Sequence, residues 1–241
     1  MNEALIRTER IMGTAAMERL RGARIAVFGV GGVGGNCAEA LARSGVGTLD
    51  LIDNDEVCRS NLNRQVFALQ STIGMKKVDA AKQRLEDISK EITVHTYPLF
   101  YLPKTRDAID FTAFDYIVDA IDTVTAKIDI IEQAMKYGVP IISSMGTGNR
   151  VDPSRLVIKD LYETKGDPLA RIMRHELRKR GIQKLTVCCS EEDPIKPLEF
   201  GEEETARRSV PGSTAFVPPA AGILIASYVV RELTQFDPDN R

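Results

Sequence analysis

The sequence is poor in cysteine, and its cysteines form no disulfide framework. The four residues are Cys37, Cys58, Cys188 and Cys189, and no CxxC motif occurs among them. This spacing argues against a disulfide-stapled secreted domain and predicts a reduced, cytoplasmic protein. The N-terminus also lacks the charged and apolar regions of a signal peptide, which supports the same expectation.

The sequence has no long uninterrupted apolar run either. The longest, residues 215–230, is broken by Pro218 and Pro219, so we interpret 220–235 as a core helix and expect no stable membrane insertion.

The net charge of the chain is close to zero, with 32 Lys and Arg against 34 Asp and Glu. Any nucleic-acid partner must therefore be bound by a local basic patch.

A glycine-rich stretch near the N-terminus is the most informative part of the chain. The apolar residues 25–28 predict a buried parallel strand, and Gly29, Gly31, Gly32 and Gly34 follow it at once. In such a loop the first glycine permits a tight turn and the second lets the backbone approach a phosphate. The last lets the next helix lie close to the sheet.

The residues after this loop complete a nucleotide-site pattern. Residues 34–44 predict a helix whose first amides would face an anion in the turn. Asp53 ends the second predicted strand, about where a carboxylate binds a ribose. The glycines alone favour NAD or FAD as the ligand.

Polar residues that follow Asp53 change the expected ligand to ATP. Asn61, Arg64 and Gln65 come within a dozen residues of it, and Lys77 follows after a turn. Two cations and amide donors suit a triphosphate whose α–β bond is broken, because they neutralise the charge of the transition state and of pyrophosphate. Taken one at a time, Arg64 and Lys77 can be interpreted as solvated surface charges, and Asn61 and Gln65 as turn residues.

Two acidic residues stand at the end of a further predicted strand. This strand covers 116–121 and carries Asp119 and Asp122 at its carboxyl end, where open α/β sheets bind ligands. We expect Asp122 to hold magnesium against the phosphates and one of the two carboxylates to cap the helix 125–137. The remaining core elements are one or two helices in 2–21, a helix in 76–89, a strand in 92–97, a helix or loop in 102–110 and a strand in 140–144.

A basic helix distinguishes the C-terminal part. Strands are predicted at 155–160 and 185–190, and Asp167 and Pro168 open a helix between them. We expect its buried stripe to be Leu169, Ile172, Met173 and Leu177. Its bases, Arg171, Arg174, Arg178, Lys179 and Arg180 with His175, are either a solvated face that complements the helix dipole or a phosphate-backbone site. The Pro- and charge-rich composition of residues 191–213 predicts a mobile loop or a partner-binding insertion, either of which fits a lid.

The core motifs resemble the adenylating domain of the ubiquitin-activating-like superfamily, the MoeB and ThiF relatives. The resemblance is carried by the glycine loop, Asp53, the run Ser60-Asn61-Leu62-x-Arg64-Gln65, Lys77 and Asp122. It implies an α/β fold with a Rossmann-like doubly wound, mainly parallel sheet, with ATP and magnesium as cofactors. It also implies a homodimer in which Arg10 reaches the nucleotide of the neighbouring subunit.

The chain departs from MoeB and ThiF in having no paired CxxC motifs for zinc. Cys188 and Cys189 fall in a predicted strand, where buried hydrophobes are expected rather than a nucleophile. The region after Gly146 contains the segments DPLARIMRHELRKRG and LTVCCS and the ending GSTAFVPPAAGILIASYVVREL. In these segments it instead resembles the tRNA threonylcarbamoyladenosine dehydratases, and the resemblance then covers nearly the whole chain. It implies ATP-dependent adenylation of the carboxylate of threonylcarbamoyladenosine in tRNA, followed by ring closure, with possible sulfur-relay partners of the cysteine desulfurase system.

The expected organisation is therefore one adenylation domain, 1–241, with an N-terminal arm at 1–21. A nucleotide-binding core covers 22–148, and a C-terminal extension that adds strands and helices and faces the tRNA covers 149–241. Two other functions remain open. One is an activator of a small ubiquitin-like sulfur-carrier protein, and the other is a non-catalytic nucleotide-binding dimer.

Overall fold

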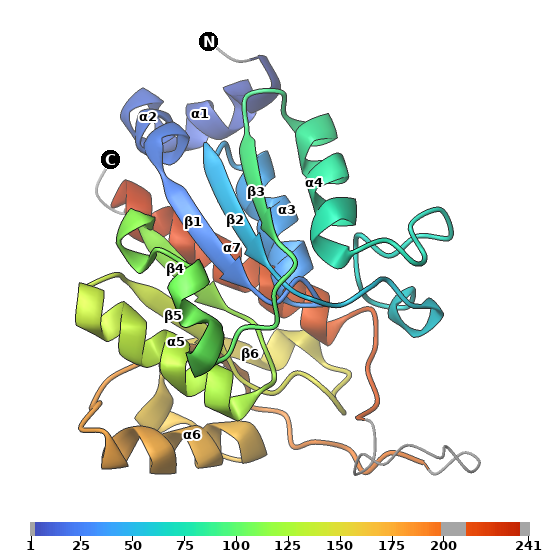
Figure 1. The fold of residues 1–241 in the computed structure, drawn as a ribbon, viewed down its shortest axis with the longest axis vertical. Coiled ribbons are helices and arrows are strands. Elements are labelled where there is room, and N and C mark those ends of the chain that lie inside the picture. The colour runs from blue at the N-terminus through green and yellow to red at the C-terminus, as the bar shows by residue number, and fades with distance from the viewer. Residues whose placement is uncertain (1–2, 199–210, 237–241) are drawn as a thin grey trace.

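The computed structural model describes residues 3–198 and 211–236, in which seven strands form one central sheet. They are β1 (Arg24–Phe28), β2 (Thr48–Ile52), β3 (Thr93–Tyr97), β4 (Tyr116–Asp119), β5 (Ile141–Ser144), β6 (Leu156–Asp160) and β7 (Thr186–Ser190). Their order is β3-β2-β1-β4-β5-β7-β6, and every pairing is parallel except that of β6 with β7 (Figure 1). The predicted α/β Rossmann-like class is confirmed.

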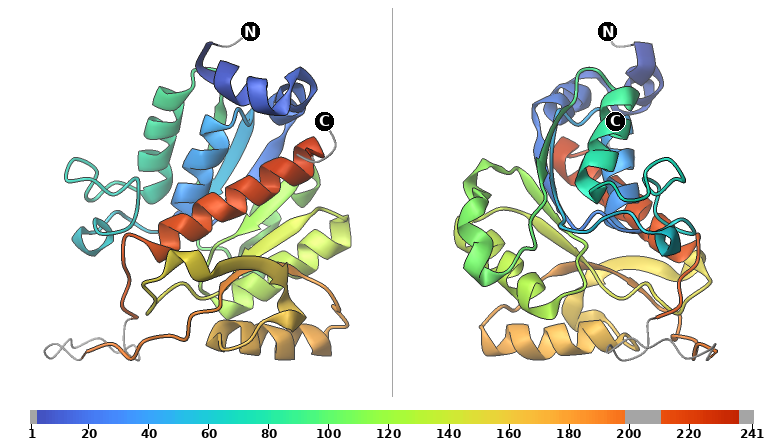
Figure 2. Two further views of the ribbon diagram at one scale, coloured as in Figure 1. Left: turned by 180° about the vertical axis from the view of Figure 1, so that it is seen from behind. Right: turned by 45° about the vertical axis from the view of Figure 1, so that its right-hand side comes forward.

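Helices surround this sheet. The α-helices of the described residues are α1 (Ile6–Met12), α2 (Thr14–Gly22), α3 (Gly34–Arg43), α4 (Lys77–Ile88), α5 (Val124–Tyr137), α6 (Pro168–Lys179) and α7 (Val217–Thr234). Figure 2 shows α3, α4 and α7 on one face and α5 and α6 on the other. Side chains of a strand alternate between faces, so Ile25 and Val27 pack into one apolar cluster while Ala26 and Phe28 pack into a second.

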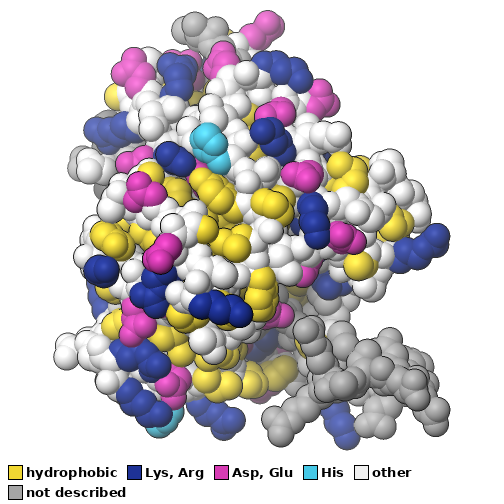
Figure 3. All heavy atoms as spheres, in the orientation of Figure 1, with side chains coloured by type: hydrophobic (Ala, Val, Ile, Leu, Met, Phe, Trp, Pro, Cys, Tyr) yellow, Lys and Arg dark blue, Asp and Glu magenta, His cyan; other side chains and the backbone are white. Residues whose placement is uncertain are grey.

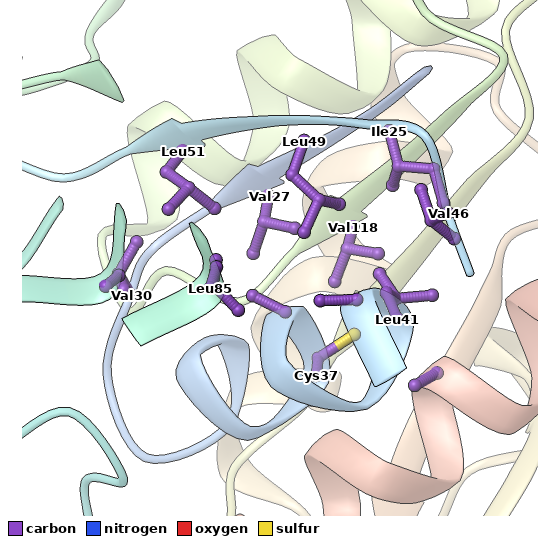
Figure 4. Packing of buried hydrophobic residues seen from close by; sticks show 14 of the residues in the cluster. Ile25, Val27, Val30, Cys37, Leu41, Val46, Leu49, Leu51, Leu85 and Val118 are labelled. Atoms are coloured by element: carbon purple, nitrogen blue, oxygen red, sulfur yellow. The ribbon is translucent and has the colours of Figure 1, made fainter. Parts of the chain in front are cut away.

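The first cluster forms around α3. Cys37 and Leu41 of this helix lie beneath side chains of β1 and β2 (Figure 4). Helix α7 crosses α3 at very close range, because a Cβ on Gly222 would lie 2.2 Å from the Val33 carbonyl oxygen. Helix α7 is thus a core helix, as predicted, and none of the described helices is long and apolar enough to cross a membrane.

The C-terminal part continues the same sheet. Strand β7 pairs in parallel with β5, and β6 returns antiparallel along its outer side. The buried stripe predicted for α6 is wrong at Ile172, which is 45% exposed, whereas Ala170 is buried. Positions 170, 173 and 177 share one helical face, and position 172 lies off it. Most of the predicted 191–213 lid, residues 199–210, lies outside the described residues.

Candidate functional site

The carboxyl ends of β1, β2, β4 and β5 meet at one edge of the sheet and border a cavity of about 590 Å³. Most residues predicted to bind the nucleotide lie around it. Those that line the cavity are Gly29, Gly31, Gly32, Asp53, Asn61, Arg64, Gln65, Lys77 and Asp122. The position is the one expected for a ligand of an open α/β sheet, because loops leave every parallel strand at this edge.

The glycine loop has the geometry that a phosphate cradle requires. Gly29 has a φ of +87°, and a Cβ there would lie 2.7 Å from the Ala120 carbonyl oxygen. Helix α3 begins so close to β1 that a Cβ on Gly34 would lie 1.8 Å from the Gly29 carbonyl oxygen. At Gly31, by contrast, the nearest atom to a Cβ is 3.8 Å away, so the backbone is open to the cavity. A phosphate can therefore approach the backbone at this position.

Asp53 fixes the loop from the end of β2. Its Oδ2 accepts a hydrogen bond from the Val30 amide at 2.7 Å, and its Oδ1 accepts one from the Asp55 amide at 2.8 Å. Each carboxylate oxygen has a second lone pair, so the carboxylate can also accept from ribose hydroxyls. Asn61 has a structural role in addition to its predicted role at the nucleotide. Its Oδ1 accepts a hydrogen bond from the Cys58 amide at 3.1 Å and caps the turn at residues 58–61.

The two predicted phosphate-binding cations are both held in place. The Lys77 ammonium donates to Asp55 Oδ2 at 2.7 Å, and its side chain is only 9% exposed. The Arg64 guanidinium donates to the Ser60 carbonyl and to Asn63 Oδ1, both at 2.8 Å. Asp55 lines the cavity and was missed at the sequence level, although its place two residues after Asp53 was a signal.

The two acidic residues after β4 have different surroundings. Asp122 is exposed and lines the cavity, whereas Asp119 is fully buried. The prediction that one of them caps α5 is wrong, because the cap residue is Thr123 and no side chain caps that end. Asp119 instead binds the buried Lys127 ammonium at 2.8 Å and accepts from the Ser143 hydroxyl.

This buried ion pair shapes one wall of the cavity. Desolvation raises the pKa of Asp119, and the Lys127 ammonium opposes that rise. The same ammonium donates to the Ile121 carbonyl at 3.1 Å, and Ile121 lines the cavity. Lys127 was missed because a lysine within an apolar helix shows its partner only when the strands are assembled.

Comparisons with known proteins agree with this arrangement. The model of the ThiF family matches residues 3–241. The tRNA threonylcarbamoyladenosine dehydratase of Bacillus subtilis (strain 168) is 42% identical over 236 residues, which cover 94% of this chain and 93% of that protein. The chain belongs to the ThiF family and, within it, to the tRNA threonylcarbamoyladenosine dehydratases.

Solved structures of this dehydratase family share the fold. The E. coli tRNA N6-threonylcarbamoyladenosine dehydratase, TcdA, in complex with AMP superimposes with a TM-score of 0.89 at 30% identity. Its complex with ATP gives 0.87 at 29% identity, and in both cases the match covers 97% of this chain and 94% of that chain.

Arg10, which the resemblance assigns to a partner's nucleotide, lies far from the cavity of its own chain. It is exposed on α1, which precedes β1 and therefore lies at the amino-terminal edge of the sheet (Figure 1). The cavity is at the opposite, carboxyl edge. Arg10 can thus contact a nucleotide only in another subunit, and the role remains a prediction.

Most of the basic side chains predicted on α6 contact other residues of the protein, which the sequence alone did not indicate. Charges of both signs are interspersed over the lower part of Figure 3, where this helix lies. The Arg174 guanidinium donates to Thr164, Lys179 and Arg180 pair with Glu176, and Arg178 stacks 5.1 Å from the Tyr162 ring centre. Within the described residues, Arg171 has no such partner, so among the predicted arginines it is the best candidate for contact with phosphate.

The two cysteines of the C-terminal region are buried in β7. Burial raises the pKa of the Cys188 thiol to about 12 and also raises that of Cys189. Neither thiol is a good nucleophile, because the thiolate is the reactive form. Cys58 is the exposed cysteine of the described chain.

Proposed function

We propose that this protein is an ATP-dependent, AMP-forming tRNA threonylcarbamoyladenosine dehydratase. The observation that carries the proposal is the convergence of an open glycine loop, Arg64 and Lys77 on one cavity. The chain shares its fold with E. coli structures of the family that contain AMP and ATP, which supports a nucleotide as the ligand. ATP binds at the glycine loop, with its ribose toward Asp53 and its phosphates toward the first amides of α3.

The first step activates a carboxylate, which is a poor electrophile because its leaving group would be oxide. The threonyl carboxylate of the modified adenosine attacks the α-phosphorus of ATP, forms an acyl adenylate and releases pyrophosphate. Arg64, Lys77 and the α3 amides neutralise the charge that gathers on the phosphates. Asn61 and Gln65 orient the α-phosphate through their amide groups.

The second step requires no nucleophile from the protein. The carbamoyl group of the same modified base attacks the activated acyl carbon and gives up one N–H proton to water. The ring closes, and AMP leaves with one former carboxylate oxygen. An intramolecular attack has a high effective concentration when the reacting groups are held in place. The buried state of Cys188 and Cys189 is compatible with this route, because no thioester is needed.

Magnesium fits the site through Asp122. The described residues contain no group of three or more His, Cys, Asp or Glu that could hold a metal ion by themselves. Asp122 would therefore hold magnesium together with phosphate oxygens and water, and the bound ion would supply positive charge beside the phosphates.

The partners follow from the same proposal. The tRNA contacts the α6 surface around Arg171, and the homodimer brings Arg10 of one subunit toward the cavity of the other. We place the protein in the cytoplasm, where a cysteine desulfurase sulfur relay is a further candidate partner.

The test uses tRNA that bears the threonylcarbamoyl modification. The protein is incubated with this tRNA and ATP, and the nucleosides are analysed by mass spectrometry. The expected product is a modified nucleoside lighter by one water, together with AMP and pyrophosphate. Unchanged nucleoside in the presence of bound ATP would contradict the proposal.

Two other measurements test the alternatives. An activator of a ubiquitin-like sulfur carrier would adenylate the C-terminal glycine of that carrier, and a covalent adduct at a cysteine would reveal it. A non-catalytic dimer would bind NAD or ATP tightly without any pyrophosphate exchange.

A further inference from the structure

A second loop faces the cavity and has no role in ATP binding so far. It follows β5, and Gly146, Thr147 and Gly148 line the cavity beside Ser144 and Met145. The loop thus shares one cavity with the glycine loop but belongs to a different strand end. It is placed to contact the molecule that reacts with ATP.

A buried arginine holds this loop from the protein side. Arg150 is 3% exposed, and its Nη1 donates to the carbonyl oxygens of Gly146 at 2.6 Å and Gly148 at 3.3 Å. Its Nη2 donates to Asp167 Oδ2 at 3.0 Å, and its Nε donates to the Glu192 carbonyl at 3.0 Å. The guanidinium therefore fixes the direction in which the Gly146 and Gly148 carbonyls point.

The direction of a carbonyl sets the direction of the amide in the same peptide group. The described chain has no cis peptide bond, so each N–H points away from the C=O to which it is joined. The Gly148 carbonyl points to Arg150, and the Asn149 N–H on its other side donates to the Gly212 carbonyl at 2.8 Å. Gly212 lines the cavity, so the Asn149 amide points to the cavity side of the loop.

The same geometry applies to the preceding peptide group. The Gly146 carbonyl points to Arg150, so the Thr147 N–H points away from the guanidinium. Within residues 3–198 and 211–236, this N–H has no hydrogen-bond acceptor in the protein. A positive charge behind the peptide polarises it, which makes its N–H a stronger donor.

We propose that the Thr147 N–H binds the threonyl carboxylate of the substrate, and then the oxyanion that forms when the carbamoyl group attacks. This inference rests on the proposed function. In the ring-closing step the electron pair of the acyl C=O moves onto its oxygen as the new bond forms. The pair returns as the bond to AMP breaks, and the carbamoyl group gives up one N–H proton to water. A fixed N–H that faces the acyl oxygen lowers the barrier.

Arg150 is a positioning residue in this proposal. It does not touch the substrate but sets the orientation of the Gly146–Thr147 peptide. Its partner Asp167 also accepts from the Ala170 amide at 2.7 Å and so caps the start of α6. One buried ion pair therefore links the carboxylate-binding loop to the helix that carries Arg171.

Two variants at one position test the amide. Thr147→Pro removes the N–H, whereas the matched control Thr147→Ala keeps it and removes only the side chain. We expect kcat of Thr147→Pro to lie about 10²–10³-fold below that of Thr147→Ala, with the same ATP affinity in both variants. Equal kcat of Thr147→Ala and a folded Thr147→Pro variant would overturn the proposal.

Arg150→Lys tests the positioning role. An ammonium keeps the positive charge but lacks the planar guanidinium, which binds the two loop carbonyls while it is held by Asp167 and the Glu192 carbonyl. We expect a loss in kcat with little change in the KM for tRNA or in the affinity for ATP. Wild-type kcat in this variant would remove Arg150 from the proposal.

A measurement on the unaltered protein decides the matter if Thr147→Pro fails to fold. The chain is labelled with [¹⁵N]threonine, and the Thr147 signal is identified by its loss in Thr147→Ala. With α,β-methylene ATP bound, an anticodon stem-loop that carries threonylcarbamoyladenosine should shift this amide signal downfield, whereas the unmodified stem-loop should not. A Thr147 signal that stays in place at saturation would overturn the proposal. Wild-type protein that never dehydrates the modified tRNA would instead contradict the proposed function.

Discussion

Replacing two glycines of the same loop by alanine should separate folding from ATP binding. At Gly34 the new Cβ would lie 1.8 Å from the Gly29 carbonyl oxygen, and a backbone atom cannot rotate away. Overpacking of this kind costs about 1–3 kcal/mol or more, and the better helix propensity of alanine offsets at most about 1 kcal/mol. We expect a net loss of about 2 kcal/mol, which lowers Tm by about 4–8 °C in a chain of this size.

At Gly31 the same methyl group meets no such obstacle. The nearest atom to its Cβ is Gln65 Nε2 at 3.8 Å, an ordinary contact, so the Tm of the free protein should not change. The methyl group would, however, occupy space that a phosphate needs, and we expect ATP affinity to fall at least about tenfold. With ATP at a hundred times the wild-type Kd, stabilisation by the ligand falls from about 2.7 to about 1.4 kcal/mol.

Thermal unfolding with and without ATP measures both effects in one assay. Gly22→Ala is the matched control, because no atom lies within 4 Å of a Cβ built there. A full ATP-induced rise in Tm for Gly31→Ala would refute the placement of the phosphates. A wild-type Tm for Gly34→Ala would refute the close approach of α3 to β1.

Three further predictions concern charged residues. Arg64→Ala or Lys77→Ala should reduce turnover about 10²–10³-fold, because each removes one donor to the phosphates; near-normal kcat would remove that residue from the mechanism. Asp119→Asn leaves the Lys127 ammonium buried without a counter-charge, so urea unfolding should show a loss of about 3–5 kcal/mol. An unchanged midpoint would show that the pair contributes nothing. Arg171→Glu should weaken tRNA binding and reduce its salt slope by about 1, with ATP affinity unchanged; an unaltered slope would make α6 an ordinary solvated helix.

The sequence was sufficient for the elements of the fold but not for their arrangement. Parallel strands buried on both faces, such as β1 and β4, are short and mainly apolar runs, and Gly29 marks the end of β1. The place of β7 between β5 and β6 could not be predicted, because it depends on pairing between residues far apart in the chain.

For the site, the residues predicted to contact ligand were easier to find than those that support them. Asp53 and Lys77 belong to a motif of fixed spacing beside the glycine loop. The supporting pairs, Lys127 with Asp119 and Arg150 with Asp167, join separate elements and become visible only when the sheet is assembled. The charge pattern of α6 was also ambiguous, since a base that binds a neighbour and a base that binds phosphate look alike in sequence.

Isotope transfer tests the central claim most directly, namely that the substrate carboxylate attacks the α-phosphorus of ATP. The threonyl carboxylate of the modified tRNA is labelled with ¹⁸O, and the products of one turnover are analysed by mass spectrometry. The account predicts that one ¹⁸O atom appears in AMP and none in pyrophosphate. Label in inorganic phosphate, with ADP as the nucleotide product, would contradict it.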